Sequence, residues 1–255
     1  MLKFYSFSNS IKINKKEQMK QLVMLAVLIS GFIMSAQSNE ALIKHFEAYR
    51  AQMQKQGDVQ GVINGMTHLN VLDPSVERTD TLAYIYMSEG KYAQALNTVG
   101  IDYKIDDSSI AVEVKAMSLK AVKQPARAIP HFEELFKRNP NALIAYELAE
   151  LSLQTQKLDD AEKHITYGIV NSKEDDLKAF YETQNPYQVT LKSAFMYLKA
   201  LTLYNKDKKA NIDAAVDILD ATLKASPNFN LIQLTKTELL RQKQALQAQA
   251  TQPQK

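Results

Sequence analysis

Two of the four histidines have the spacing most suggestive of chemistry in this sequence. His131 and His164 each follow an alanine by three residues, so they occupy equivalent positions in two similar segments. A zinc site needs three or four ligands, with nitrogens at about 2 Å, and no third ligand has a matching position. We therefore expect both histidines to be exposed and unpaired, and we predict no metal site.

Other catalytic patterns are missing from the sequence. It contains no phosphate-binding glycine loop, no GxSxG elbow, no HExxH motif and no calcium loop. Carboxylate pairs such as Asp159–Asp160 fall in expected exposed turns, whereas acid–base catalysis needs two groups that converge on a pocket. Cysteine is absent, which excludes disulfides, thiol catalysis, cysteine-ligated zinc and a lipoprotein anchor. We predict a protein that is not an enzyme and has no cofactor.

Composition indicates helices throughout. The 255 residues include only seven glycines and seven prolines and no convincing alternating strand pattern, so the expected fold class is all-α. Five lysines and one glutamate give residues 1–36 a charge of +4, which leaves 26 basic and 27 acidic residues elsewhere. Because this remainder is nearly neutral and has no basic stripe, we expect no nucleic-acid partner.

The segment 76–107 shows the organising pattern most clearly. Small and apolar residues recur at helical spacing on both sides of Gly90, which lets the chain reverse with a positive φ angle. The two expected helices carry Leu82, Ala83 and Tyr86, then Tyr92, Ala95, Leu96 and Val99. A single hairpin of this size cannot bury its apolar face, so it requires stacked copies.

Such copies recur every 33 residues, except that the last interval is longer. Their small or β-branched anchors are Val62, Ala95, Ala128, Ala161 and Ala215. A bulky apolar residue follows each anchor by four positions. Three copies end at a proline twelve residues after the anchor, namely Pro74, Pro140 and Pro227.

This pattern resembles the tetratricopeptide repeat (TPR), a helix-turn-helix of 34 residues, over roughly 40–227. The clearest single line is 128–141, and the departures are the 33-residue period, the lack of tryptophan, and Lys115 where the family usually has leucine. The resemblance implies a right-handed α-solenoid of about five hairpins over 37–227. A capping helix is expected at 228–246 and a frayed tail at 247–255.

The interval from Ala161 to Ala215 exceeds the regular period because of an insertion. The excess lies near 171–188. Ser172 and Asp175 resemble a capping box, so this insertion is expected to form an additional or extended helix over 173–183.

Residues 1–36 are typical of a secretory signal peptide. An apolar run at 22–34 follows Lys20 and precedes small residues suited to cleavage after Ala36. The run is too short to span a bilayer comfortably, although an uncleaved anchor is the alternative. Residues 1–18 are surplus to this pattern, so we interpret Met19 as the true start. We expect an exported protein of the periplasm or envelope, in a Gram-negative bacterium, without stable membrane insertion after cleavage.

The first helix of each hairpin lines a concave groove in TPR proteins. By this register, the candidate partner-binding residues are Glu47, Asp80, Tyr84, Met87, Glu113, Met117, Tyr146 and Glu150. Three carboxylates at equivalent positions of successive repeats (Glu47, Asp80 and Glu113) predict an acidic ladder that favours basic residues on a partner. The Tyr and Met residues are expected apolar anchors. Alternatively, these Tyr and Met side chains pack between repeats and the carboxylates form a solvated face.

Together these features predict a non-enzymatic scaffold that binds a protein or peptide segment in its groove. The Lys and Asn clamp by which some TPR proteins hold a peptide carboxylate is absent. Two alternatives stay open: a structural assembly component of an outer-membrane complex, and a binder of carbohydrate or another small ligand. The latter would need aromatic side chains gathered in one pocket.

Overall fold

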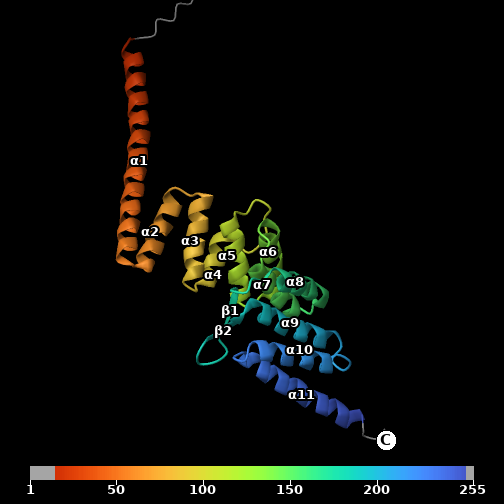
Figure 1. Ribbon diagram of the computed structural model, residues 1–255. Coiled ribbons are helices and arrows are strands. Elements are labelled where there is room, and N and C mark those ends of the chain that lie inside the picture. Colours follow the sequence, from red (N-terminus) through yellow and green to blue (C-terminus); the bar gives the residue numbers. More distant parts are fainter. Residues whose placement is uncertain (1–14, 251–255) are drawn as a thin grey trace, which may run out of the picture. The chain divides into compact units, whose positions relative to one another are not determined.

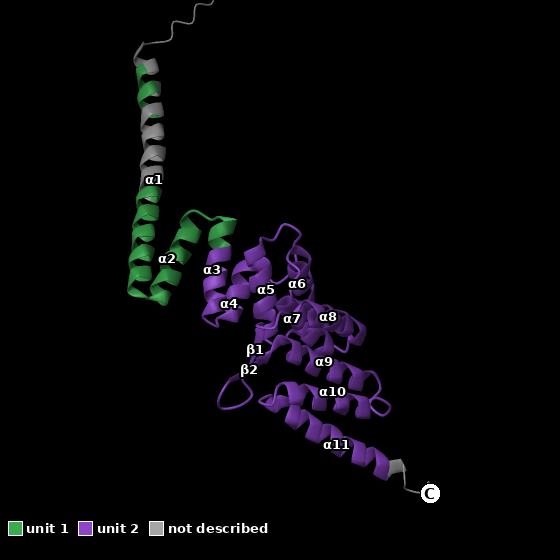
Figure 2. Cartoon of the chain, in the orientation of Figure 1, with its two compact units in different colours: residues 1–79 green, residues 80–255 purple. Residues whose placement is uncertain are grey.

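The computed structural model describes the backbone of residues 15–250, with side chains at 19, 20, 22–24 and 39–248. It divides into two compact units, residues 1–79 and 80–255, with the boundary inside one helix (Figure 2). Most of the predicted signal peptide, including its cleavage site after Ala36, lies outside the residues whose side chains are described. Within the described part, no helix combines the length and apolar character needed to cross a membrane.

Unit 1 is built on an antiparallel pair of helices, α1 (Lys15–Gln56) and α2 (Val59–Leu72). Gly57 reverses the chain with φ of +72°, and the Asp58 side chain accepts a hydrogen bond from the Gly61 amide to cap α2. Phe46 stacks on the ring of His68, with 4.2 Å between ring centroids. The unit ends in the first turn of α3 (Val76–Ser88).

Unit 2 is a row of helices in which each contacts the next from α4 to α11 (Figure 1). After the remainder of α3, the helices are α4 (Tyr92–Val99), α5 (Ser109–Ala121), α6 (Pro125–Arg138), α7 (Ala142–Gln154), α8 (Leu158–Asn171), α9 (Leu191–Lys206), α10 (Ile212–Ala225) and α11 (Asn230–Ala250). The anchors Ala95, Ala128, Ala161 and Ala215 are completely buried, as the repeat pattern predicts, whereas the anchor Val62 in unit 1 is only half-buried. Only a small side chain allows neighbouring helices to approach so closely, so the all-α solenoid is confirmed.

The turns between paired helices follow the same period as the anchors. Gly90 has φ of +70°, as predicted, and positive φ also occurs at Lys123 and Gln156, where φ is +59°. Together with Gly57, these positions are equivalent in four successive repeats. Glycine usually occupies positions with positive φ. Because Lys123 and Gln156 stand there instead, the sequence does not indicate these two turns.

The prediction of a helix over 173–183 is wrong, because the insertion at 171–188 leads into a β-hairpin. Strands β1 (Leu177–Phe180) and β2 (Tyr187–Thr190) pair antiparallel, with Leu177 opposite Thr190 and Phe180 opposite Tyr187. The Ser172 hydroxyl donates to the Gly168 carbonyl, which ends α8, and Asp176 accepts a hydrogen bond from the Lys173 amide. Phe180 of β1 and Tyr187 of β2 both pack on the buried ring of Phe229. This contact favours the strands over the predicted helix.

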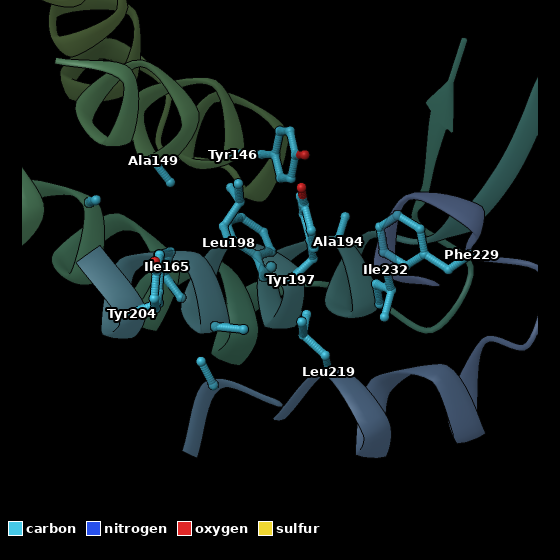
Figure 3. Packing of buried hydrophobic residues seen from close by; sticks show 14 of the residues in the cluster. Tyr146, Ala149, Ile165, Ala194, Tyr197, Leu198, Tyr204, Leu219, Phe229 and Ile232 are labelled. Carbon is cyan, nitrogen blue, oxygen red and sulfur yellow. The ribbon is translucent and has the colours of Figure 1, made fainter. Parts of the chain in front are cut away.

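The largest apolar core of unit 2 lies between α7 and α11. Figure 3 shows Tyr146 and Ala149 of α7, Ala194, Tyr197 and Leu198 of α9, Leu219 of α10, and Phe229 and Ile232 just before and just after the start of α11. Helix α11 packs on α10 through this core and runs to Ala250, four residues beyond the expected end of the capping helix at 246. Residues 251–255 of the expected tail lie outside the described part.

Candidate functional site

The exposed face of the first helices in unit 2 carries large apolar side chains at repeating positions. Tyr84 on α3 and Met117 on α5 are equivalent in the 33-residue register, and their exposed fractions are 44 and 42 %. Ile110 lies two helical turns before Met117 on the same face of α5, and Leu143 is the equivalent of Ile110 on α7. Both are also exposed. We call Tyr84, Ile110, Met117 and Leu143 the exposed stripe.

Two expected members of the site are buried, so the prediction that they face a partner is wrong for them. Tyr146 is 1 % exposed, because α9 and the hairpin cover it. Phe195 meets its ring edge-on at 5.5 Å, and the Lys178 ammonium lies 4.5 Å from the ring centroid. Burial and the neighbouring carboxylates raise the pKa of the Tyr146 hydroxyl far above its usual range, so it stays protonated.

Asp80 is the second buried member, at 5 % exposed. Its carboxylate accepts a hydrogen bond of 2.5 Å from the hydroxyl of Ser108. Ser108 in turn accepts from the Ala111 amide and so caps the start of α5. The predicted ladder is therefore broken at Asp80, which joins two helices of the stack, and Glu47 is exposed on α1 in unit 1.

The remaining candidates differ in how they are held. Glu113 is exposed beside the stripe, and Met87 is half-buried against Ala83, Ala95 and Val114. Glu150 is half-buried and lies 2.6 Å from the Lys120 ammonium. The structure thus leaves Tyr84, Met117 and Glu113 open to solvent, while it ties Glu150 into an ion pair.

That ion pair belongs to a network that crosses three elements. Lys120 on α5 also binds Glu147 on α7, and Glu147 lies 3.0 Å from Lys178 on β1. Burial opposes the charged form of both Lys120 and Glu147. The opposite charges outweigh it, raising the pKa of Lys120 and lowering that of Glu147, so both stay ionised. The network fastens the hairpin to the first helices and leaves little net charge there.

Sequence reasoning missed Ile110, Leu143, Glu147 and Lys178. The first three could have been found from helical periodicity: Leu143, Glu147 and Glu150 fall on one face of α7 at spacings of four and three residues. Tyr146 sits between Ala145 and Leu148, on the buried side. Lys178 had no such signal, because its position depends on the hairpin.

His131 and His164 are buried, contrary to the expectation that both are exposed. His131 is 2 % exposed, and its Nε2 donates a hydrogen bond of 3.0 Å to the Ile101 carbonyl. The ring of His164 packs edge-on against Phe136 of the preceding second helix. Each ring packs against a residue of the preceding repeat, Ile101 for His131 and Phe136 for His164. The repeat register alone does not predict these contacts. Among the residues that the structure describes, no group of three or more potential ligands could hold a metal ion.

These buried rings predict a pH-dependent stability. Burial lowers the pKa of both His131 and His164 below the ordinary value of 6.5, and Nδ1 of each ring has no partner within the described residues. Well above pH 6.5 both rings are neutral whether the chain is folded or not. As the pH falls below 6.5 the unfolded chain binds protons first, so the free energy of unfolding decreases by up to about 1.4 kcal/mol per pH unit and histidine.

Denaturant unfolding at pH 7.5, 6.5 and 5.5 measures this effect. We expect the decrease to lie below pH 6.5, and the variant with both His131→Gln and His164→Gln to lose most of it. Folding also lowers the pKa of carboxyl groups such as Glu147 and Glu134. Their protonation changes the free energy of unfolding mainly below pH 4.5, which is outside this range. An equal slope in the double variant would show that the rings do not cause it.

The stacked helix hairpins, buried small anchors and repeated exposed positions define the fold of TPR proteins, so the predicted resemblance is confirmed at the level of fold. Solved structures that share it include three with TM-scores above 0.5. YrrB, described as a TPR protein with an unusual peptide-binding site, has a TM-score of 0.57 and 12 % identity, covering 75 % of this chain and 90 % of that one.

A TPR protein from Parabacteroides merdae ATCC 43184 has a TM-score of 0.56 and 17 % identity, covering 82 % of this chain and 75 % of that one. MamA has a TM-score of 0.52 and 17 % identity, covering 72 and 91 %. Neither a protein-family model nor a curated protein gives a significant match. At these identities, the likeness establishes the fold alone.

Proposed function

We propose that this protein is a non-enzymatic scaffold of the bacterial periplasm or envelope, and that it binds a segment of a partner protein along the exposed stripe of unit 2. The observation that carries the proposal is the repeated exposure of apolar side chains at equivalent positions, Tyr84 with Met117 and Ile110 with Leu143. Exposed apolar groups arranged in a row are typical of recognition surfaces. The peptide-binding site described for YrrB supports the same use of this fold.

The charges beside the stripe favour a mainly apolar partner segment. Lys120 and Lys178 neutralise much of the charge of Glu147 and Glu150, so these carboxylates offer little attraction to a basic partner. Glu113 is exposed and has no ion pair within the described residues. A partner segment with two or three apolar side chains and one Lys or Arg near Glu113 would match this pattern.

The location in the envelope rests on the sequence of residues 19–36. A charged start, an apolar run and small residues before Gln37 are the features that export signals share. Mass spectrometry of the N-terminus of the natural protein tests this part separately. A mature chain that starts at Gln37 supports export, and one that retains Leu22 contradicts it.

The binding surface is tested by affinity capture from the envelope fraction, followed by titration with peptides from the captured proteins. We expect the combined substitution of Tyr84, Met117 and Leu143 by alanine to weaken peptide binding at least tenfold, because apolar anchors of this kind contribute about 1–2 kcal/mol each. Leu234→Ala is the matched control, since Leu234 is 62 % exposed on α11 and lies outside the stripe.

Unchanged peptide affinity in the triple variant would refute binding at the stripe, provided that its circular dichroism and melting temperature match those of the unaltered protein. Capture of outer-membrane proteins through a surface that the triple variant leaves intact would instead indicate the assembly role. Capture that is lost in the triple variant therefore supports binding at the stripe, and capture that the triple variant retains supports the assembly role.

A further inference from the structure

A cavity of about 260 Å³ lies between α8 and α9, on helices that carry none of the exposed stripe. Ile165, Ile169 and Val170 of α8 and Leu203 of α9 form its apolar wall. Val170 is 76 % exposed at its edge, so the cavity opens to solvent beside an apolar side chain. A cavity with such walls holds water poorly and accepts apolar groups.

The polar groups of the cavity include one cation without a counter-ion. Lys206 is held 2.6 Å from Glu162 and 3.0 Å from Asp159, and hydrogen bonds to these two carboxylates raise its pKa. Its charge is therefore already balanced. Lys199 also lines the cavity and is exposed, and within the described residues it forms no ion pair or hydrogen bond. The lining thus offers a free positive charge at the mouth of an apolar cavity.

Thr202 adds a second polar group without a partner. It lines the cavity and is 3 % exposed, and its hydroxyl has no hydrogen-bond partner within the described residues. Buried hydroxyls are almost always paired, so this one requires an explanation. Lys199 and Thr202 are three residues apart on α9, which places them on one face of the helix. The Thr202 hydroxyl oxygen itself has almost no accessible surface, so rotation about the Cα–Cβ bond would be needed to bring it to an anionic group beside Lys199.

We propose that this cavity binds a small aliphatic carboxylate. The carboxylate lies against the Lys199 ammonium at the mouth and meets the Thr202 hydroxyl once that side chain rotates, and the hydrocarbon chain lies against the apolar residues of α8 and against Leu203. At about 30 Å³ for each water-sized group, the cavity has room for about eight or nine heavy atoms. That size suits a chain of six to eight carbons and excludes a longer peptide segment.

Isothermal titration of the purified protein with straight-chain carboxylates from butanoate to dodecanoate tests the proposal. We expect a dissociation constant on the order of 0.1–1 mM for octanoate. Affinity should rise about fourfold with each added methylene group and level off near eight carbons, when the cavity is full. An affinity that rises steadily through dodecanoate would indicate non-specific adsorption and overturn the proposal.

Substitutions separate the charge from the cavity. Lys199→Gln should weaken octanoate binding about two- to fivefold and leave octan-1-ol binding unchanged. Lys192→Gln is the matched control, because Lys192 is exposed on the same helix and does not line the cavity. Equal octanoate affinity in both variants would refute the role of Lys199.

Two larger side chains test occupancy of the cavity itself. Val170→Trp changes an exposed residue at the edge, so folding is preserved, and Leu203→Phe fills the interior. Both should reduce octanoate and octan-1-ol binding at least tenfold, whereas Val71→Trp, at a similarly exposed valine of α2, should not. The proposal is overturned if both blocked variants bind octanoate normally. It is also overturned if a peptide ending in leucine binds there while octanoate does not.

Discussion

Replacing Lys115 by methionine is expected to destabilise unit 2 by about 3 kcal/mol, because removing one partner of a buried ion pair leaves the other charge uncompensated. Lys115 is completely buried, although the TPR family usually has leucine there. Its ammonium donates to the Asp107 carboxylate at 2.6 Å and to the Asp102 carbonyl at 2.9 Å. Both acceptors belong to the loop 100–108, so methionine would fill the space and release the loop. The melting temperature should fall by roughly 6–12 °C.

Adding Asp107→Asn tests the cause of this loss. The double variant should be more stable than Lys115→Met alone, since the neutral amide no longer needs a cation and its side-chain oxygen can still accept from the Lys104 amide. Amide hydrogen exchange in 100–108 should quicken in the single variant and not in Lys192→Met. A Lys115→Met protein within about 1 kcal/mol of the original would show that the pair does not hold the loop.

Replacing Gly168 by alanine should destabilise the packing of α8 on α9. A Cβ atom at this position would lie 1.9 Å from Cζ of Phe195, a completely buried ring that also meets Tyr146 edge-on. Alanine would favour the helix by about 1 kcal/mol, but overpacking of this kind costs about 1–3 kcal/mol or more, so the clash decides the sign. Denaturant unfolding should show a lower midpoint with an unchanged slope.

The variant Gly168→Ala with Phe195→Leu separates this clash from other effects. Phe195→Leu alone leaves a void and lowers stability, whereas the smaller side chain provides room for the new methyl group. The double variant should therefore be more stable than the sum of the two single changes predicts. Strictly additive losses would mean that Gly168 and Phe195 do not compete for the same space.

Only part of the candidate site was predictable from the sequence: the 33-residue register places Tyr84, Glu113 and Met117 on the exposed face of the first helices. The same register placed Asp80 and Tyr146 there as well. It failed for them because each is covered by a segment outside its own helix: Ser108 binds Asp80, and α9 with the inserted hairpin covers Tyr146. Exposure of a residue depends on what packs over it, and the repeat pattern does not record that.

The sequence by itself determined the helical class, the repeat period and the buried anchors. These properties depend on residue type at short range: alanine permits close helix contacts, apolar residues at helical spacing form one face, and proline ends the second helix. The tertiary structure decided the rest. It formed a β-hairpin over 177–190 by packing Phe180 and Tyr187 on Phe229, buried His131 and His164 between segments, and left Lys199 without a counter-ion beside a cavity. Each of these results from contacts between residues far apart in the chain, whose free energies outweigh local preference.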